Sequence, residues 1–490
     1  MAHIFRTGVS AALIASLAAP AVAQVTLPAP APATPTAQVT PVAPVAPSVV
    51  LPDLSPTQAE QLVAMLDRAS LAHGLRQTGS RPPITNPEPQ LVAKAALDYA
   101  RAVRSGRLDT ADFIEDWGLR PERYDPLPAF ADAVKRDRLA QWIASLPPPY
   151  AGYDGLQKGL EQYRTIRDAG GWTSLAAGPD LTVGAKGARV AALRKRLAVE
   201  DPEVAKTGDS FDAELKAAVV RAQRRYGLNP SGVVSTGTLA ALNVPANARV
   251  QQIVANMERW RWLPPEMPKD RIQVNIAAAV VTVFEGDQPI MSMRGVTGRP
   301  GNATPMLKST IHSIVLNPPW NVPTSIATKE LWPKGAAYLT RNGYKIIGTG
   351  PNRRLQQQAG PNAALGRFKF DFDNPYAVYL HDTPSRGTFA SYSRLASHGC
   401  IRLEKPQALA ELLLRDDSAW APETLQTAVD TGETQRVQLG RKAAVYLLYW
   451  TAFASQNGTM NFRGDPYSWD GLLADKIEKR SAMQTTVASR

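Results

Sequence analysis

Apolar residues recur at helical spacing through most of the first half of the chain. Ser55 and Pro56 suit the cap and first turn of a helix, and the stretch LVAMLDRASLAHG that follows ends at Gly74. Further helices are predicted over 89–104, 129–145 and 155–168. Residues 55–180 show no catalytic constellation in sequence, and we interpret them as a helical scaffold domain.

A second helical unit is predicted over residues 181–245. Val190 and Leu197 share one helical face, a second helix follows Asp212 as its N-cap, and a third follows Thr236. Three helices in about 60 residues predict a small bundle with its own core.

From Arg271 the spacing of apolar residues changes from a helical pattern to one typical of β-strands. The stretch RIQVNIAAAVVTVFEG alternates apolar and polar residues and then turns. More strand-like runs lie at 290–297, 308–316 and 376–381. Residues 270–425 are therefore predicted to form a mostly β domain.

Residues 324–367 form an insertion that is longer than a compact β domain needs. Long insertions serve either as lids over a cleft or as packed peripheral subdomains, and both interpretations stay open. After the β domain, residues 436–475 are predicted to pack on the scaffold or on the β domain. The predicted fold class is thus multidomain α+β.

The N-terminus predicts export. Arg6, a short apolar run and the pattern Ala21-Val22-Ala23 are typical of a cleaved signal peptide over residues 1–23, with a short membrane anchor as the alternative. Residues 24–54 are rich in Pro, Ala and Val, which predicts an extended, disordered tether.

Composition narrows the function classes. The 490-residue chain has no apolar run of the roughly 18 residues that a membrane-spanning helix needs. Its net charge of +12 favours carboxylate-rich or polyanionic partners. No long Lys/Arg run supports nucleic-acid binding.

The one cysteine, Cys400, lies in the stretch SHGCIRL. In an exported protein a single cysteine cannot form an internal disulfide, so Cys400 is either a free reactive thiol or an intermolecular link. The alternative is a buried cysteine that only fills apolar space. A thiol attacks a carbonyl as thiolate, and a histidine can take its proton. His381 and His398 both compete for that role. Gly399 would let backbone amides approach a developing oxyanion.

The pattern from His381 to SHGC, with 15 residues between that histidine and Ser397, resembles the signature of YkuD-type L,D-transpeptidases. The stretches LNPPWNVP, GPNAALGRFKF, LHDTP and AVYLLYWTAFASQNGTMNFRGDPY resemble the larger periplasmic, YcbB-like subfamily. The stretch from GARVAALRKRL to TLAALN, within 181–245, resembles a peptidoglycan-binding domain. The resemblance implies a periplasmic location.

The resemblance also implies the site. Cys400 would be the nucleophile and His381 the base, oriented by the backbone carbonyl of Asp382. The amides of His398, Gly399 and Cys400 would form the oxyanion hole. Candidates to bind substrate are Arg402, which stands where many members have Asn, and also Trp320, Asn321 and Tyr376.

The implied reaction is acyl transfer between peptidoglycan stem peptides. Cys400 would form a thioester at the third stem residue and release D-Ala, and a second stem's amine would resolve it as a 3→3 cross-link. No cofactor or metal is expected, and other wall-synthesis enzymes are possible partners. The open alternatives are an L,D-carboxypeptidase, attachment of an outer-membrane protein to peptidoglycan, and a non-enzymatic wall-binding protein.

Overall fold

The computed structural model describes residues 50–76 and 87–488, with side chains described as far as residue 481. The predicted signal peptide and nearly all of the predicted tether lie outside these residues. Within the described ranges, no helix combines the length and apolar character needed to cross a membrane.

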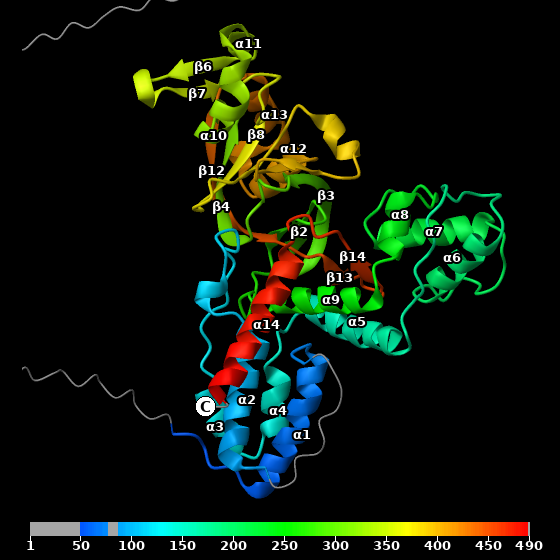
Figure 1. Ribbon diagram of the computed structural model, residues 1–490. Helices are drawn as coiled ribbons and strands as arrows, with labels where there is room; N and C mark the ends of the chain where they lie inside the picture. Colours follow the sequence, from blue (N-terminus) through cyan, green and yellow to red (C-terminus); the bar gives the residue numbers. More distant parts are fainter. Residues whose placement is uncertain (1–49, 77–86, 489–490) are drawn as a thin grey trace, which may run out of the picture. The chain divides into compact units, whose positions relative to one another are not determined.

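Four N-terminal helices share a core of their own (Figure 1). Ser55 caps the first helix, since its hydroxyl accepts the N–H of Gln58 at 3.2 Å. The single helix predicted over 129–145 is wrong: the polar run KRDR interrupts the apolar pattern, and Asp137 takes a left-handed conformation (φ 52°). The helices are α1 (Pro56–Ala72), α2 (Pro89–Ser105), α3 (Leu127–Lys135) and α4 (Leu139–Ser145).

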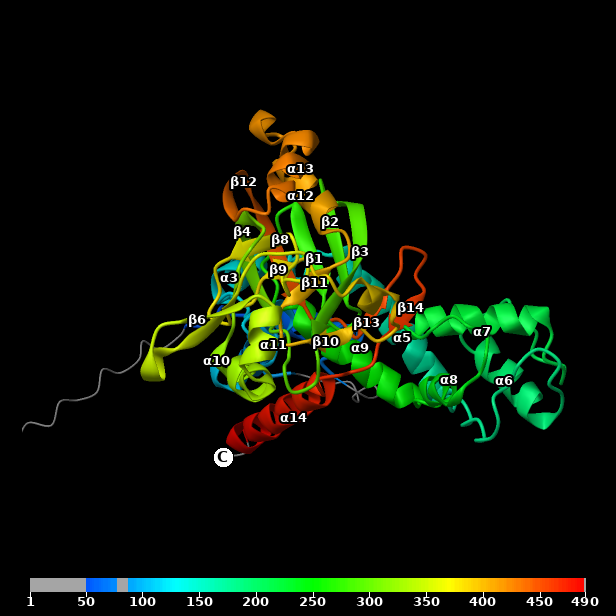
Figure 2. The ribbon, with the colours of Figure 1, turned by 90° about the horizontal axis from the view of Figure 1, so that it is seen from above.

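Two further helices, α5 (Ala151–Asp168) and α9 (Ala246–Trp260), lie side by side in both views (Figures 1 and 2). The apolar pattern misses α9 because charged residues are buried in it. Glu258 is fully buried and accepts hydrogen bonds from Arg107 Nε (3.0 Å) and Arg261 Nη1 (2.8 Å). Two cations therefore neutralise one buried carboxylate, and burial is tolerated only because of this pairing.

The small helical unit has the three predicted helices, which group together in both figures. Asp212 caps the second helix by accepting the N–H of Leu215 at 2.8 Å. Buried Gln223 links the unit internally, donating to Val233 O and accepting the N–H of Gly232, each at 2.8 Å. The helices are α6 (Ala188–Ala198), α7 (Ala213–Arg225) and α8 (Thr236–Leu242).

A nine-stranded sheet forms the C-terminal domain, and with the helical N-terminal region it confirms the predicted α+β class. Its order is β10-β3-β11-β9-β8-β4-β12-β1-β2, and β2 also pairs with β3, so the sheet closes on itself. Figure 2 shows its strands from above. The strands are β1 (Arg271–Asn275), β2 (Val280–Glu285), β3 (Gln288–Gly298), β4 (Leu307–Leu316), β8 (Phe368–Phe372), β9 (Leu380–His381), β10 (Leu395–Ser397), β11 (Ile401–Leu403) and β12 (Gln435–Leu448).

Two elements of this sheet differ from the sequence expectation. The strand predicted over 376–381 is reduced to β9, because Ala377 has φ 53° and the Asn374 side chain accepts the N–H groups of Tyr376 and Val378 in a turn. The segment 436–475 does not merely pack on the domain. Its strand β12 lies between β4 and β1, antiparallel to one and parallel to the other.

The insertion, together with residues 320–323 that precede its predicted start, has a three-stranded sheet and a small core of its own (Figure 1). Its core holds Val322, Ala327, Leu331, Leu339 and Leu355. The elements are β5 (Trp320–Asn321), α10 (Thr324–Ile326), the π-helix η2 (Ala327–Leu331), the 3-10 helix η3 (Trp332–Lys334), α11 (Ala336–Arg341), β6 (Tyr344–Ile347) and β7 (Arg354–Gln357).

Helices α12 (Pro406–Leu414) and α13 (Pro422–Asp430) follow β11. The hairpin β13 (Ala452–Ala454) and β14 (Met460–Phe462) and the final helix α14 (Trp469–Ala488) come after β12. Asp470 of α14 pairs with buried Arg259 of α9 at 2.5 Å, which ties the end of the chain to the helical region.

Candidate active site

The parallel pairing of β9 with β11 sets the candidate site. Leu380 pairs with Ile401, and His381 pairs with Arg402. Because paired residues in neighbouring strands point to the same face and successive residues alternate, His381 and Arg402 share one face. Leu380 and Ile401 are fully buried on the other face, in the domain core.

The same alternation brings in the residues just before the two strands. The N–H of Ile401 donates to the carbonyl of Tyr379 at 3.0 Å, which sets Cys400 opposite Tyr379. The rings of Tyr379 and His381 lie edge to face, 5.6 Å apart, so both point to one side. The thiol, the phenol and the imidazole therefore occupy one polar face.

Strand β8 adds charge to this face. Lys369 pairs with His381 in the antiparallel register, and its Nζ lies 4.5 Å from the centre of the Tyr379 ring. Asp371 accepts from Lys369 at 2.6 Å and from Arg436 at 2.9 Å. The carboxylate is thus already paired, and the face is left with a surplus of positive charge.

The thiol of Cys400 is neutral in this setting. Burial raises its pKa, while hydrogen bonding from Tyr379 and the cations Lys369 and Arg402 act in the opposite direction. Burial also raises the pKa of Tyr379 well above its ordinary value, so its phenol stays protonated.

The imidazole of His381 is buried and has a fixed tautomer. Its Nδ1–H donates to the carbonyl of Asp382 at 2.5 Å, which leaves Nε2 as the basic nitrogen. Burial, with a smaller effect from Arg402, lowers the pKa of His381 to about 3. Among the described residues no hydrogen bond joins His381 to Cys400, so the two lie on one face as a neutral acid and a neutral base rather than as an ion pair.

The SHGC turn depends on Gly399. Its φ of +115° is disfavoured for other residues, and a Cβ there would lie 3.3 Å from the carbonyl oxygen of Ala303. Thr304 Oγ1 donates to the Gly399 carbonyl at 2.7 Å. Ser397 Oγ accepts the Gly399 N–H at 3.1 Å and donates to the Cys400 carbonyl at 2.6 Å. One of the three amides predicted for an oxyanion hole therefore already has a partner.

The second histidine, His398, has a different neighbour. Its Nε2 lies 2.7 Å from Glu330 Oε1 in η2, a residue of the insertion. Its ring is thus engaged by a carboxylate and is not the imidazole that shares a face with Tyr379.

The predicted substrate-binding residues separate into two groups. The Nε of Arg402 is buried and, within the described chain, has no hydrogen-bond partner, while Trp320 donates to the Tyr379 hydroxyl. These two belong to the polar face. Asn321 instead accepts from Gln356 in the insertion sheet at 2.9 Å.

Tyr376 lies outside the group around Cys400. Its hydroxyl donates to the carbonyl of Glu115 at 2.7 Å, a contact with the helical region. Sequence reasoning missed Tyr379, Lys369 and Glu330. Strand alternation could have indicated Tyr379, two residues before His381, but no local signal marks the other two.

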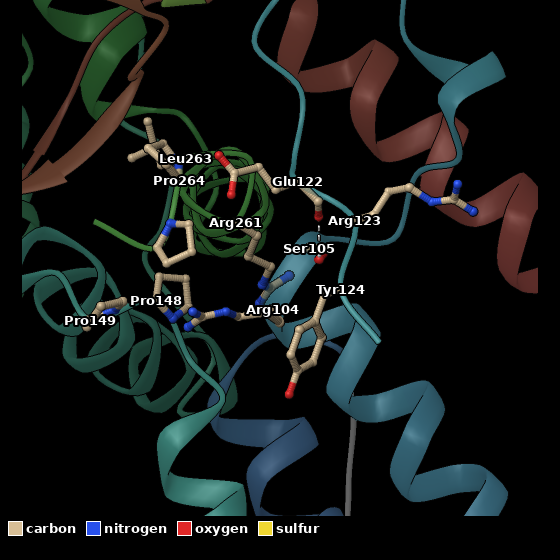
Figure 3. Close-up of a pocket in the computed structure, with 11 residues that line it drawn as sticks. Arg104, Ser105, Glu122, Arg123, Tyr124, Pro148, Pro149, Arg261, Leu263 and Pro264 are labelled. Carbon is tan, nitrogen blue, oxygen red and sulfur yellow. Dashed lines mark hydrogen bonds between the residues drawn. The ribbon is translucent and has the colours of Figure 1, made fainter. Parts of the chain in front are cut away.

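The pocket in Figure 3 is a separate feature. It has a volume of about 90 Å³ and is lined by residues of the helical region, among them Arg104, Tyr124 and Arg261. None of its lining residues belongs to the polar face around Cys400. In the described part of the chain, no group of three or more His, Cys, Asp and Glu side chains is placed to hold a metal ion.

Three segments of the chain match known domain families. Residues 269–434 match the L,D-transpeptidase catalytic domain, YkuD. Residues 90–160 match a scaffold domain, and residues 186–242 match a domain described as "Putative peptidoglycan binding domain".

Comparison with whole proteins gives partial coverage. A Haemophilus influenzae protein named "Putative L,D-transpeptidase" is 31% identical over 240 residues, which is 45% of this chain and 48% of that relative. The chain thus aligns with about half the length of the curated relative it matches.

Two crystal structures of L,D-transpeptidases match more weakly. The one from Xylanimonas cellulosilytica has 16% identity, 56% coverage of this chain, 98% of its own and a TM-score of 0.19. The one from Stackebrandtia nassauensis has 14% identity, 56% and 97% coverage and a TM-score of 0.23. Such low TM-scores are no evidence of a shared fold. The segment 269–434, which includes both His381 and the SHGC turn, thus matches the L,D-transpeptidase catalytic domain, YkuD.

Proposed function

We propose that this protein is an exported L,D-transpeptidase that forms 3→3 cross-links between peptidoglycan stem peptides, in the manner of the YcbB-like subfamily. One observation supports the proposal most strongly. Within residues 269–434, which match the catalytic domain, the pairing of β9 with β11 sets Cys400, Tyr379 and His381 on one face of the sheet. The peptidoglycan-binding match over 186–242 and the net charge of +12 support a carboxylate-rich wall substrate.

In the first step, acylation, the neutral thiol of Cys400 and the neutral imidazole of His381 act together. Sγ of Cys400 attacks the carbonyl carbon of the third stem residue as its proton passes to Nε2 of His381. The tetrahedral intermediate collapses with cleavage of the peptide bond, and His381 gives the proton to the departing D-Ala amine. The products are a thioester on Cys400 and free D-Ala.

The second step reverses these roles. The side-chain amine of another stem attacks the thioester carbonyl, His381 takes its proton, and the proton returns to the sulfur as the thiol leaves. The new amide is the 3→3 cross-link. Asp382 keeps Nε2 available in both steps, because its carbonyl holds the proton on Nδ1.

The negative charge that develops on sulfur and on the carbonyl oxygen needs stabilisation. Lys369 and Arg402 supply positive charge beside the partly buried thiol, where such charge acts more strongly than in open water. The amides of Cys400 and His398 are the proposed donors to the oxyanion, since that of Gly399 is engaged by Ser397. The unpaired Nε of Arg402 suits a substrate carboxylate.

The test is to incubate the purified protein with a disaccharide-tetrapeptide and to weigh the products. A transpeptidase gives a cross-linked dimer with loss of one D-Ala. Tripeptide alone would show an L,D-carboxypeptidase, and no change with either wild type or Cys400→Ala would refute catalysis and leave a wall-binding protein. Transfer to an outer-membrane protein amine instead of a stem amine would redefine the acceptor.

A further inference from the structure

The insertion carries a single acidic residue. Between residues 324 and 367 there are seven Lys and Arg residues, and Glu330 is the one Asp or Glu. Its side chain does not pair with any of the insertion's own cations. It pairs instead with two residues of the catalytic domain, Arg299 and His398.

The chemistry of the three side chains decides which of them donates each hydrogen bond and which accepts it. Arg299 has only donors, so it cannot accept from His398, although its Nη2 lies 2.9 Å from Nε2. Glu330 has only acceptors when ionised. The consistent assignment is that His398 Nε2–H donates to Glu330 Oε1 at 2.7 Å and that Arg299 Nη2 donates to the same carboxylate at 3.1 Å. Hydrogen bonding from His398, followed by that from Arg299, lowers the pKa of Glu330.

Both partners of Glu330 are linked to the SHGC turn: His398 is part of it, and Arg299 is hydrogen-bonded to it. His398 is two residues from Cys400. The backbone N–H of Arg299 donates to the Ser397 carbonyl at 3.0 Å, and its Nε donates to Asn302 at 3.0 Å. A displacement of Glu330 would therefore be transmitted to the peptide groups beside the thiol.

We propose that Glu330 is a positioning residue: docked on His398 and Arg299, it ties the insertion to the SHGC turn and so fixes the amides beside Cys400 for acylation. The inference rests on the proposed function, because it assigns a role in the same acyl transfer. It also predicts that seating of the insertion and the geometry of the turn are coupled.

The size of the effect follows from exposure. The side chains of Glu330, Arg299 and His398 are 40%, 46% and 27% exposed. Ion pairs this accessible are weak, although charge-assisted hydrogen bonds in a group of three are stronger than a lone surface pair. We expect a loss of about three- to tenfold in acylation rate rather than its abolition.

The experiment compares two reagents on the full chain. A carbapenem acylates Cys400 through a carbonyl and needs the oxyanion donors, whereas iodoacetamide alkylates the thiol and does not. Rates are measured by intact mass for wild type, Glu330→Gln, His398→Gln and the double variant. The matched control is Glu423→Gln, since Glu423 is an exposed acid in the first turn of α13 with no ion pair among the described residues.

The expected result is selective and non-additive. Glu330→Gln slows carbapenem acylation about three- to tenfold while alkylation changes less than twofold. In the His398→Gln background the same change slows acylation by a smaller factor, because only the pair with Arg299 remains to be lost, and Glu423→Gln equals wild type. Equal acylation of Glu330→Gln and wild type would overturn the inference, as would a parallel fall in alkylation. If wild type takes up no carbapenem while iodoacetamide still modifies Cys400, the proposed function itself fails.

Discussion

Replacing Tyr379 with Phe tests the electrostatics of the thiol directly. The variant removes the hydroxyl that interacts with Cys400 but keeps the ring, which contacts His381 edge to face and lies under Lys369. A hydroxyl that donates to a thiolate favours the charged form, so it lowers the thiol pKa, and its removal raises that pKa.

The magnitude follows from the hydrogen bond. A hydrogen bond to a charged group contributes about 1.5–3 kcal/mol. One pKa unit corresponds to about 1.4 kcal/mol, so the loss predicts a rise of about 1 to 2 units in the pKa of Cys400. At a pH below that pKa, the thiolate population and the alkylation rate fall about ten- to a hundredfold.

The assay is the pH dependence of iodoacetamide alkylation, with Tyr376→Phe as the matched control. Tyr376 also loses a hydroxyl in that variant, but its partner is the carbonyl of Glu115. The control should have the wild-type profile. An alkylation pKa in Tyr379→Phe that is unchanged or lower than wild type would refute the electrostatic account.

Three further predictions concern other residues. Arg402→Gln removes a cation that lowers the pKa values of both Cys400 and His381, so both pKa values should rise. The pH profile of alkylation reports the pKa of Cys400, and NMR titration of the ring reports that of His381; a fall in either would contradict this. Gly399→Ala forces a side chain onto a backbone with φ +115° at a cost of about 1–3 kcal/mol, and acylation should fall about tenfold or more; wild-type rates would show that the turn relaxes. Glu258→Gln leaves Arg107 and Arg261 without their buried carboxylate and should destabilise the fold by about 3–5 kcal/mol in urea titration; an unchanged midpoint would disprove the role of this pair.

The sequence predicted the candidate catalytic residues better than the residues that surround them in the fold. Cys400, His381 and Gly399 stand out because a lone thiol, a strand-end histidine and a glycine form a local pattern. Glu330 could not be found this way, because it is 68 residues from His398 and meets it only through the folding of the insertion.

The fold shows the same division. Helices with a clean apolar stripe, such as α2 (Pro89–Ser105), begin and end close to their predicted limits. Helix α9 was missed because it buries Glu258 and Arg259. The central place of β12 was missed because strand order depends on pairing between distant segments, which periodicity does not encode.

The most direct test of a thiol nucleophile is to trap the thioester that it forms. The protein is mixed with a donor tetrapeptide in the absence of an acceptor, quenched in acid and analysed by peptide mass spectrometry. Wild type should carry the tripeptidyl group as a thioester on Cys400 with one equivalent of released D-Ala, and His381→Ala should form it far more slowly than His398→Ala. An acyl group on any other residue, or equal rates in the two histidine variants, would contradict the account.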